Sequence, residues 1–172
     1  MNRRIIIVTG EPQEGKSTLL ARCLEKIHDL HVGGFLAKGL WKNNLRDGFD
    51  LIDLAAGTST VLARRNPLAQ PGEIPFTFFK KGMEAGMRAL ESERCAHADL
   101  VCVDEVGKLE MNDRGWAPQL APLLKLNHPM HLWVVRKHFV EPVCQKWNLI
   151  SPSIVSVNKS DALATLLRIV RK

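Results

Sequence analysis

Residues Gly10 to Ser17 read Gly-Glu-Pro-Gln-Glu-Gly-Lys-Ser, which matches the spacing G-x-x-x-x-G-K-[ST] at every fixed position. An apolar run precedes these residues, and a segment with helical spacing follows them directly. The two glycines permit backbone angles that turn successive N–H groups toward a phosphate, and the start of a helix adds its positive dipole end. The spacing therefore predicts a loop that binds the phosphates of a nucleotide.

Several residue types within this loop suggest a role toward the nucleotide. Lys16 is expected to reach the β- and γ-phosphates, the Ser17 hydroxyl to ligate Mg²⁺, and Thr18 to extend the contacts toward the α-phosphate. Because a carboxylate facing a triphosphate costs binding energy, Glu11 and Glu14 are interpreted as pointing to solvent, or Glu14 as ordering an attacking water. The predicted nucleotide-binding residues are Gly10, Gln13, Glu14, Gly15, Lys16, Ser17 and Thr18.

A second pair of reactive residues, Asp104 and Glu105, ends the apolar run from Leu100 to Val103. In a parallel sheet the carboxyl ends of the strands open onto the ligand crevice, so we expect this pair to meet a nucleotide bound by the loop. Asp104 is predicted to hold Mg²⁺ through its water shell, together with Ser17. Glu105 is predicted as the catalytic base that accepts a proton from, or orients, the water attacking the γ-phosphate.

The order of the two acids bears on the reaction. An acidic residue directly after the magnesium-binding aspartate is typical of phosphate-loop proteins that activate water, and these usually have a strand inserted between the two motif strands. We expect the runs Val32 to Ala37 and Phe49 to Leu54, with the helix that begins at Lys80, to provide that insertion. Hydrolysis is therefore favoured over phosphoryl transfer to a small acceptor.

The elements that must position these residues alternate along the chain, which is typical of strands joined by crossover helices into a mostly parallel sheet with helices on both faces. The strands at 5–9, 100–104 and 131–135 are continuously apolar, and they are predicted to be central. The predicted strands are Ile5 to Thr9, Val32 to Ala37, Phe49 to Leu54, Leu100 to Asp104, His131 to Val135 and Ile154 to Val157. The predicted helices are Lys16 to His28, Lys80 to His97, Gly115 to Leu126, Phe139 to Trp147 and Ser160 to Val170.

The segment from Gly39 to Gly72 departs from this alternation. Residues Trp41 to Gly48 are typical of a hairpin connection that leads into the strand at Phe49. The stretch from Ala69 to Pro75 is predicted to be a loop because of its proline and glycine content. We therefore predict one domain over residues 1–172, with a hairpin and loop insertion at 39–72.

Composition limits the class of protein further. The 172 residues are 45% apolar and 24% charged, which excludes disordered, collagen-like and disulfide-scaffold proteins. A formal net charge of +6 suits an anionic ligand. No run approaches the ~18 apolar residues of a membrane span, and the four cysteines form no C-x-x-C pair. The sequence predicts a cytoplasmic, reduced protein without a structural metal and without membrane association.

With both motifs in view, the chain resembles the small P-loop nucleoside-triphosphatase family, of the cancer-related nucleoside-triphosphatase type. The stretch Asp104-Glu105-Val106-Gly107-Lys108-Leu109-Glu110 is the most specific match, and Gly33-Gly34-Phe35 and Arg46-Asp47-Gly48-Phe49-Asp50 are similar to two further strands. The resemblance implies a three-layer, RecA-like sheet and slow, Mg²⁺-dependent hydrolysis of ATP, GTP and other nucleoside triphosphates. It also implies Lys16 and Ser17 as phosphate and metal ligands, Asp104 as the Walker B acid and Glu105 as the base.

Four further residues have alternative roles by sequence. Arg136 follows a predicted central strand, where many relatives have small or hydroxyl residues, and it is a candidate for stabilising charge at the γ-phosphate, with an ordinary surface or ion-pair arginine as the alternative. Lys108 either neutralises phosphate charge or pairs with Glu110. Trp41, on the hairpin, is a candidate for stacking a base, although packing is the commoner role of tryptophan.

Alternatives to a nucleoside-triphosphatase with broad base tolerance remain open. A small-molecule kinase needs an acceptor pocket. A nucleotide-dependent switch hydrolyses only when a protein partner stimulates it, and the 39–72 insertion is the expected contact surface. The sequence does not favour nucleic-acid binding, because it lacks an aromatic and basic repeat for strand binding.

Overall fold

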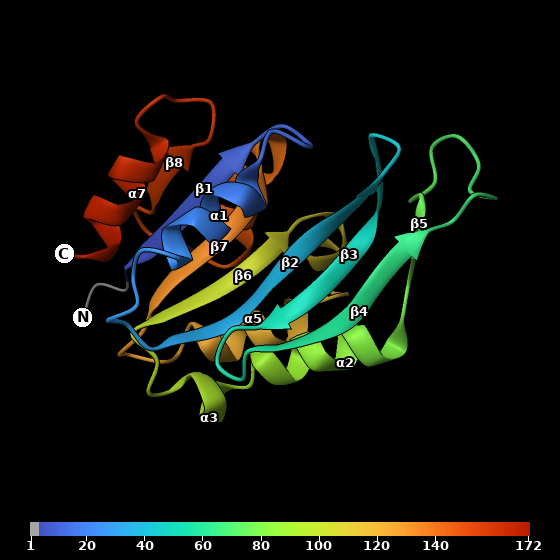
Figure 1. Cartoon of the computed structure of the whole chain (residues 1–172). Helices are drawn as coiled ribbons and strands as arrows, with labels where there is room; N and C mark the ends of the chain where they lie inside the picture. The colour runs from blue at the N-terminus through green and yellow to red at the C-terminus, as the bar shows by residue number, and fades with distance from the viewer. Residues whose placement is uncertain (1–3) are drawn as a thin grey trace.

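Eight strands form a single mixed sheet in the computed structural model, which describes residues 4–172 (Figure 1). The order across the sheet is β5-β4-β3-β2-β6-β7-β1-β8. Strands β2, β6, β7, β1 and β8 run parallel to one another, whereas β3, β4 and β5 are added to the edge of β2 by antiparallel pairing. The strands are β1 (Ile5–Gly10), β2 (Val32–Lys42), β3 (Leu45–Asp53), β4 (Thr58–Arg65), β5 (Phe76–Phe78), β6 (Leu100–Val106), β7 (Met130–Arg136) and β8 (Ser153–Ser156).

Helices cover both faces of this sheet, so the fold has the predicted three layers (Figure 1). Helices α1 (Lys16–Leu24) and α7 (Ala162–Val170) pack on one face. The other face is covered by α2 (Lys80–Ala89), α3 (Ser92–Cys95), α5 (Ala117–Leu123) and α6 (Val140–Lys146). The short α4 (Lys108–Met111) and a 3₁₀ turn, η1 (Lys137–Phe139), follow β6 and β7.

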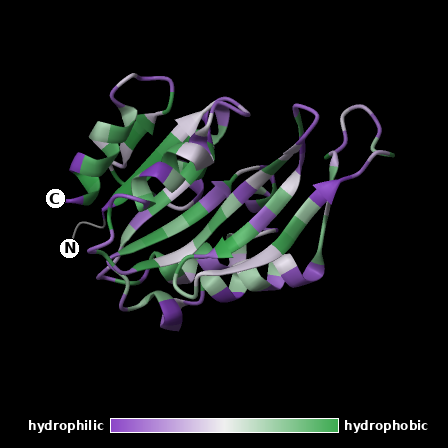
Figure 2. Cartoon of the chain, in the orientation of Figure 1, coloured by the Kyte–Doolittle hydropathy of each residue, from purple (hydrophilic) through white to green (hydrophobic). Residues whose placement is uncertain are grey.

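The central strands are buried on both sides. In β1, Ile5 and Ile7 join the core under α2 and α5, while Ile6 and Val8 join the core under α1 and α7. Hydrophobic residues follow the central strands and hydrophilic residues collect on the outer helix surfaces (Figure 2). This two-sided burial explains why β1, β6 and β7 are continuously apolar, and it confirms their prediction as central strands.

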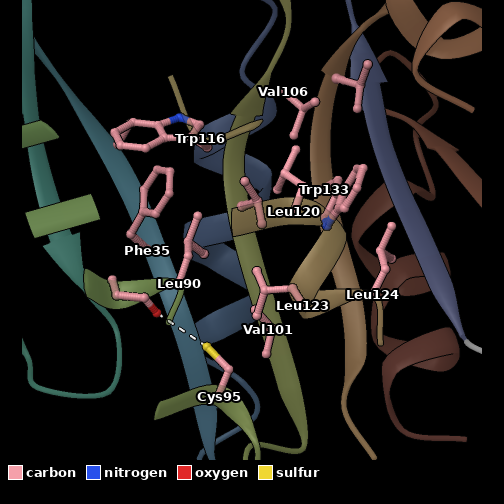
Figure 3. Close-up of a cluster of buried hydrophobic side chains, with 14 of the residues drawn as sticks. Phe35, Leu90, Cys95, Val101, Val106, Trp116, Leu120, Leu123, Leu124 and Trp133 are labelled. Carbon is pink, nitrogen blue, oxygen red and sulfur yellow. Dashed lines mark hydrogen bonds between the residues drawn. The ribbon is translucent and has the colours of Figure 1, made fainter. Parts of the chain in front are cut away.

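Aromatic side chains fill the core on the α2 and α5 side (Figure 3). The rings of Phe35 and Trp116 lie 4.7 Å apart, and those of Trp133 and Trp147 lie 5.8 Å apart in an edge-to-face arrangement. Trp133 is fully buried. Three of the four tryptophans therefore serve packing, which leaves Trp41 as the tryptophan that is 54% exposed.

The prediction of which strand separates the two motif strands was wrong. Strand β7 lies between β1 and β6, whereas β2 and β3, which contain the expected insertion, lie on the far side of β6. The reason is the order of the connections: the chain leaves β6 through α4 and α5 and returns as β7 directly beside β6, while α1 carries it from β1 past two strand positions to β2. The inserted strand is thus present, but it comes from residues 130–136.

The predicted hairpin is confirmed. Asn43 and Asn44 connect β2 to β3 and have φ of +49° and +60°, the left-handed values that a two-residue turn between right-twisted strands requires. Strands β4 and β5 are not among the predicted strands, because β4 is polar at five of its eight residues and β5 has three residues. The segment 39–72 therefore widens the main sheet by antiparallel strands.

Two helix predictions need correction. The expected helix Lys80 to His97 is divided into α2 and α3, because Glu91 takes an extended backbone between them. The expected helix Gly115 to Leu126 is shorter in the structure. Helix α5 ends one residue after Pro122, as the missing N–H of proline leads one to expect.

Within residues 4–172, none of the helices has the length and apolar character needed to span a membrane.

Candidate functional site

The loop between β1 and α1 wraps around its own lysine. Gly15 begins the helix with φ of +89°, a left-handed conformation that favours glycine, and Gln13 is also left-handed at +64°. The Lys16 ammonium donates to the carbonyl oxygens of Gly10 at 3.2 Å and Glu11 at 2.6 Å. Because Lys16 is only 7% exposed, burial lowers its pKa, and the nearby carboxylate of Glu105 opposes that shift.

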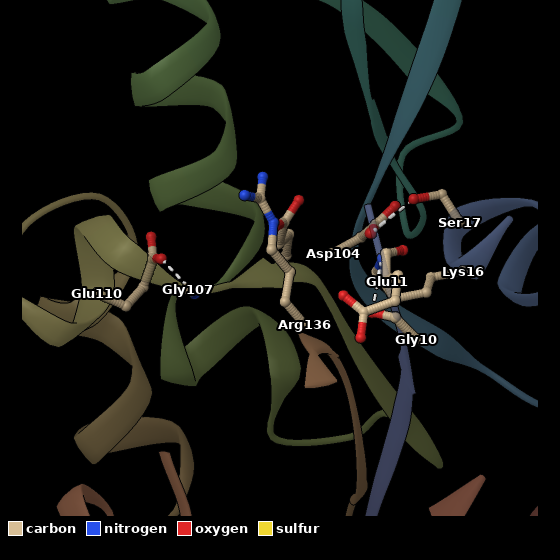
Figure 4. A network of polar contacts seen from close by, with 9 residues as sticks. Gly10, Glu11, Lys16, Ser17, Asp104, Gly107, Glu110 and Arg136 are labelled. Carbon is tan, nitrogen blue, oxygen red and sulfur yellow. Dashed lines mark hydrogen bonds and ion pairs between the residues drawn. The ribbon is translucent and has the colours of Figure 1, made fainter. Parts of the chain in front are cut away.

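A hydrogen bond joins this loop to the end of β6 (Figure 4). The Ser17 hydroxyl donates to Oδ1 of Asp104 at 2.9 Å, and the Ala37 N–H donates to Oδ2 of the same carboxylate at 3.0 Å. Asp104 is 2% exposed, and this burial raises its pKa to about 7. The two sequence motifs, 87 residues apart, therefore meet at one point.

Glu105 occupies an irregular position in β6. Asp104 pairs with Val134 and Val106 pairs with Val135, so Glu105 is the extra residue of a β-bulge and has no partner in β7. Its Oε1 accepts a hydrogen bond from Nε of Arg136 at 2.5 Å. The bulge brings Glu105 and Arg136 together beside the buried Asp104, on the side of the loop where the terminal phosphate of a nucleotide is expected.

The remaining loop residues are exposed. Glu14 turns its carboxylate back onto the loop, where Oε2 accepts a hydrogen bond from the Glu11 N–H at 2.6 Å. Gln13 and Thr18 line the cleft beside the loop. The structure thus brings the predicted site residues together where strands β1, β6 and β7 end, with Glu11 and Glu14 at the solvent-facing surface.

Glu110 has a structural role that the sequence left open. Its carboxylate accepts a hydrogen bond from the backbone N–H of Gly107 at 2.8 Å (Figure 4). It accepts a second one from the backbone N–H of Trp116 at 3.1 Å. Burial of this side chain, which is 3% exposed, raises its pKa. Lys108 is exposed, and no ion pair between it and Glu110 is found in the described part of the chain.

A cleft of about 420 Å³ opens between the phosphate loop and the hairpin of β2 and β3. Arg46, to which the sequence analysis assigned no role, lines this cleft. Its guanidinium carbon is 4.2 Å from the centre of the Trp41 ring and 5.0 Å from that of Phe49. The only sequence signal for a functional role of Arg46 was its place in the Arg-Asp-Gly-Phe-Asp stretch. Arg46 is far from the phosphate loop along the chain, and an arginine on a hairpin does not by itself indicate a contact with that loop.

The Ser17 and Asp104 oxygens suit a magnesium ion. Within residues 4–172, no group of three or more His, Cys, Asp or Glu side chains is placed to hold a metal unaided. Magnesium needs no such group, because it usually keeps several waters and takes one or two protein oxygens together with substrate phosphates. A hydroxyl and a buried carboxylate 2.9 Å apart beside a phosphate loop fit that requirement.

Comparisons with known proteins agree with this geometry. The chain is 36% identical over 110 residues to nucleoside-triphosphatase THEP1 of Archaeoglobus fulgidus, which covers 63% of this chain and 64% of that protein. It is 29% identical over 164 residues to nucleoside-triphosphatase THEP1 of Methanocaldococcus jannaschii, with 90% and 91% covered. The solution structure of a human cancer-related nucleoside triphosphatase superposes with a TM-score of 0.72 at 22% identity, over 98% of this chain and 96% of that one.

This likeness of fold extends over nearly the whole chain. The sequence model of one family, described as NTPase, matches residues 5–166, which include the phosphate loop, the acid pair and Arg136. The chain therefore belongs to the NTPase family.

Proposed function

We propose that the chain is a Mg²⁺-dependent nucleoside-triphosphatase that hydrolyses ATP, GTP and other nucleoside triphosphates to the diphosphate and phosphate. The observation that supports this most is the 2.9 Å hydrogen bond between Ser17 and Asp104, which joins the phosphate loop to the strand that ends in the acid pair. Relatives in the family are named for the same class of activity.

The phosphate loop supplies binding. Backbone N–H groups at the start of α1 face the phosphates, and the helix dipole favours their negative charge. Lys16 is held within reach by the carbonyl oxygens of Gly10 and Glu11, and its ammonium exchanges these partners for the β- and γ-phosphates when a nucleotide binds. Gln13, Glu14, Gly15 and Thr18 complete the loop.

Glu105 is the proposed base. Its Oε2 is left to orient the attacking water and accept its proton, since Oε1 is bound by Arg136. Mg²⁺, held by Ser17 and Asp104, would neutralise charge on the β- and γ-phosphates. Broad base tolerance is expected because the contacts assigned here all go to phosphates and metal, which every nucleoside triphosphate shares.

Steady-state release of phosphate from ATP, GTP, CTP and UTP, each with Mg²⁺ and with a chelator, tests this proposal. We expect all four nucleotides to be hydrolysed with Mg²⁺ and none of them to be hydrolysed with the chelator. The matched variant is Lys16→Ala, which should lose most triphosphate binding while its far-ultraviolet circular dichroism stays unchanged. A purified wild-type protein that binds the nucleotides and releases no phosphate would contradict the proposal.

A small-molecule kinase is the second candidate, and one observation favours it. A pocket of about 180 Å³ adjoins the cleft and shares Glu105, Arg136 and Phe49 with it. Its other walls are mainly apolar and include Met83 and Trp116. Phosphate released without any added acceptor separates hydrolysis from transfer, because a kinase requires the acceptor.

The proposal also includes a protein partner at the 39–72 segment and a cytoplasmic location. Large apolar side chains are exposed on the 39–72 segment, at Trp41, Leu45 and Leu68, which supports a protein contact there. A nucleotide-dependent switch would show turnover only after such a partner is added. Cys23, Cys95, Cys102 and Cys144 are all free thiols, which supports a reducing, cytoplasmic location.

A further inference from the structure

Arg46 has an unusual environment for an arginine on a surface hairpin. It belongs to β3, and its guanidinium lies over the backbone of the neighbouring strand at Gly39. The rings of Trp41 and Phe49 pack against it at 4.2 Å and 5.0 Å. Contact with two aromatic rings restricts the rotamers of the guanidinium, since each ring attracts the cation.

The charge of this guanidinium is not neutralised by an ion pair. Within residues 4–172 no carboxylate lies within ion-pair distance of Arg46, and its buried Nε has no hydrogen-bond partner. Burial lowers its pKa, and the carboxylate of Asp104 opposes that shift. The buried Nε makes this cation partly desolvated, and the terminal nitrogens, which are not among the buried unpaired atoms, are free to donate to a ligand in the cleft.

The position of Arg46 indicates what that ligand is. Its side chain lines the same cleft as Lys16, Ser17 and Glu105. Strand β6, which carries Asp104 and Glu105, and the phosphate loop both contribute residues to this cleft, so Arg46 lies at the part of the site where the metal-bound end of a triphosphate is expected. Phosphate oxygens are the acceptors that a guanidinium fork binds best.

Arg136 is less suited to this task. Its Nε is bound to Glu105, so part of its positive charge is already compensated by that carboxylate. Within residues 4–172 Arg46 has no such partner, and the hairpin holds it in the same cleft as the base.

We propose that Arg46 binds the γ-phosphate of the nucleoside triphosphate and stabilises the charge that develops as this group is transferred to water. The proposal rests on the hydrolysis proposed above. In that step the bond between the γ-phosphorus and the β,γ-bridging oxygen breaks, and a bond from water to phosphorus forms. The bridging oxygen keeps the electron pair, and Glu105 takes the proton of water. Arg46 donates to the oxygens on which this negative charge collects.

Gly39 is a positioning residue in this account. A Cβ built at this residue would lie 1.1 Å from a terminal nitrogen of Arg46, so any other residue there forces the guanidinium to move. Gly39→Ala thus displaces the cation while leaving its chemistry in the protein. This provides a second variant that does not depend on removing the arginine.

The test uses the full chain with Mg²⁺ and compares two ligands, ADP alone and ADP with aluminium fluoride, which imitates the transferred phosphoryl group. Isothermal titration gives both affinities, and phosphate release gives kcat. Arg46→Ala and Gly39→Ala should lower kcat about 100-fold and weaken the aluminium fluoride complex by a similar factor, with ADP affinity changed less than about 3-fold. Arg46→Lys should recover part of both losses. Lys42→Ala, on the same hairpin and outside the cleft, is the control and should match the wild type.

Each outcome decides the question. Normal binding of the aluminium fluoride complex by Arg46→Ala and Gly39→Ala would overturn the proposal, and so would an equal loss of affinity for ADP. If Arg46→Ala does not fold, judged by thermal unfolding, Gly39→Ala and Arg46→Lys give the answer. A wild-type protein that fails to hydrolyse any nucleotide overturns the proposed function, whereas active Arg46 variants overturn only the role of Arg46.

Discussion

Arg136 and Glu105 form an ion pair across the two neighbouring strands β6 and β7, with Nε and Oε1 2.5 Å apart. Glu105 reaches this partner because the β-bulge removes it from the regular ladder. The two side chains are 43% and 37% exposed, so the pair lies at the surface of the cleft. Arg136 thereby fixes the direction of the proposed base.

Substitution of the base should separate binding from turnover. Glu105→Gln keeps the shape of the side chain and the acceptor for Arg136, but the neutral amide cannot take a proton from water. We expect nucleotide affinity close to that of the wild type and a kcat that is reduced about 100-fold or more, in the range of a lost general base. Titration of a fluorescent ATP analogue and steady-state phosphate release measure the two quantities. Normal hydrolysis by Glu105→Gln would show that the base is another group.

Removal of Arg136 should affect turnover more than affinity. Arg136→Ala frees Glu105 to rotate, so the base spends less time toward the attacking water, while the phosphate loop stays intact. We expect kcat to fall about 10-fold or more and KM to change by less than about 3-fold. Equal changes in kcat/KM and in affinity would instead indicate that Arg136 binds the substrate in its ground state.

The buried Asp104 should make the stability of the metal-free protein depend on pH. Its folded-state pKa of about 7 lies above the ordinary value, so between about pH 4 and pH 7 the folded state holds a proton that the unfolded state has lost. The contribution of Asp104 to the free energy of unfolding therefore falls as the pH rises from 4 to 7, and it stays reduced above pH 7. Urea unfolding at pH 8 should find Asp104→Asn more stable than the wild type by roughly 2–4 kcal/mol.

The control for this prediction is Asp113→Asn, because the Asp113 side chain is 84% exposed. It should leave the pH dependence of the free energy of unfolding unchanged. A wild-type stability that rises steadily between pH 5 and pH 8, with no difference in Asp104→Asn, would contradict the assigned pKa shift.

Glu110 should matter for folding more than for chemistry. Glu110→Ala leaves the N–H groups of Gly107 and Trp116 buried without an acceptor, which should cost about 2–4 kcal/mol of unfolding free energy. Glu110→Gln, with one carbonyl oxygen left, should lose about half as much. Asn112→Ala, an exposed change at the residue after the same short helix, removes one surface hydrogen bond to the Lys108 carbonyl and should stay within about 0.5 kcal/mol of the wild type. Chemical denaturation followed by tryptophan fluorescence measures all three.

The central part of the fold and the loop were predictable from sequence because each depends on local signals. The glycines and Lys16 define the loop through backbone angles, and the apolar runs of β1, β6 and β7 report burial on both faces. The hairpin was predictable for the same reason, since Asn43 and Asn44 accept the left-handed angles of its turn.

Features that depend on pairing between distant segments were not predictable. The position of β7 between β1 and β6 follows from how the crossover connections pack. No residue of β7 indicates this position in the sequence. The bulge at Glu105 is defined by register against β7, and the stack of Arg46 on Trp41 and Phe49 is defined by register within the hairpin. Polar strands such as β4 also give a weak signal, because one of their faces is wet.

The place of β7 has a consequence for biosynthesis. Strands β1 and β6 are kept two strand spacings apart, about 10 Å, by a segment that the ribosome makes after both of them. A nascent chain that has emerged only to residue 129 contains the phosphate loop and the acid pair but lacks the spacer that sets their separation. Enzymatic competence should therefore arise late in translation, once residues 130–136 have inserted between two strands already made.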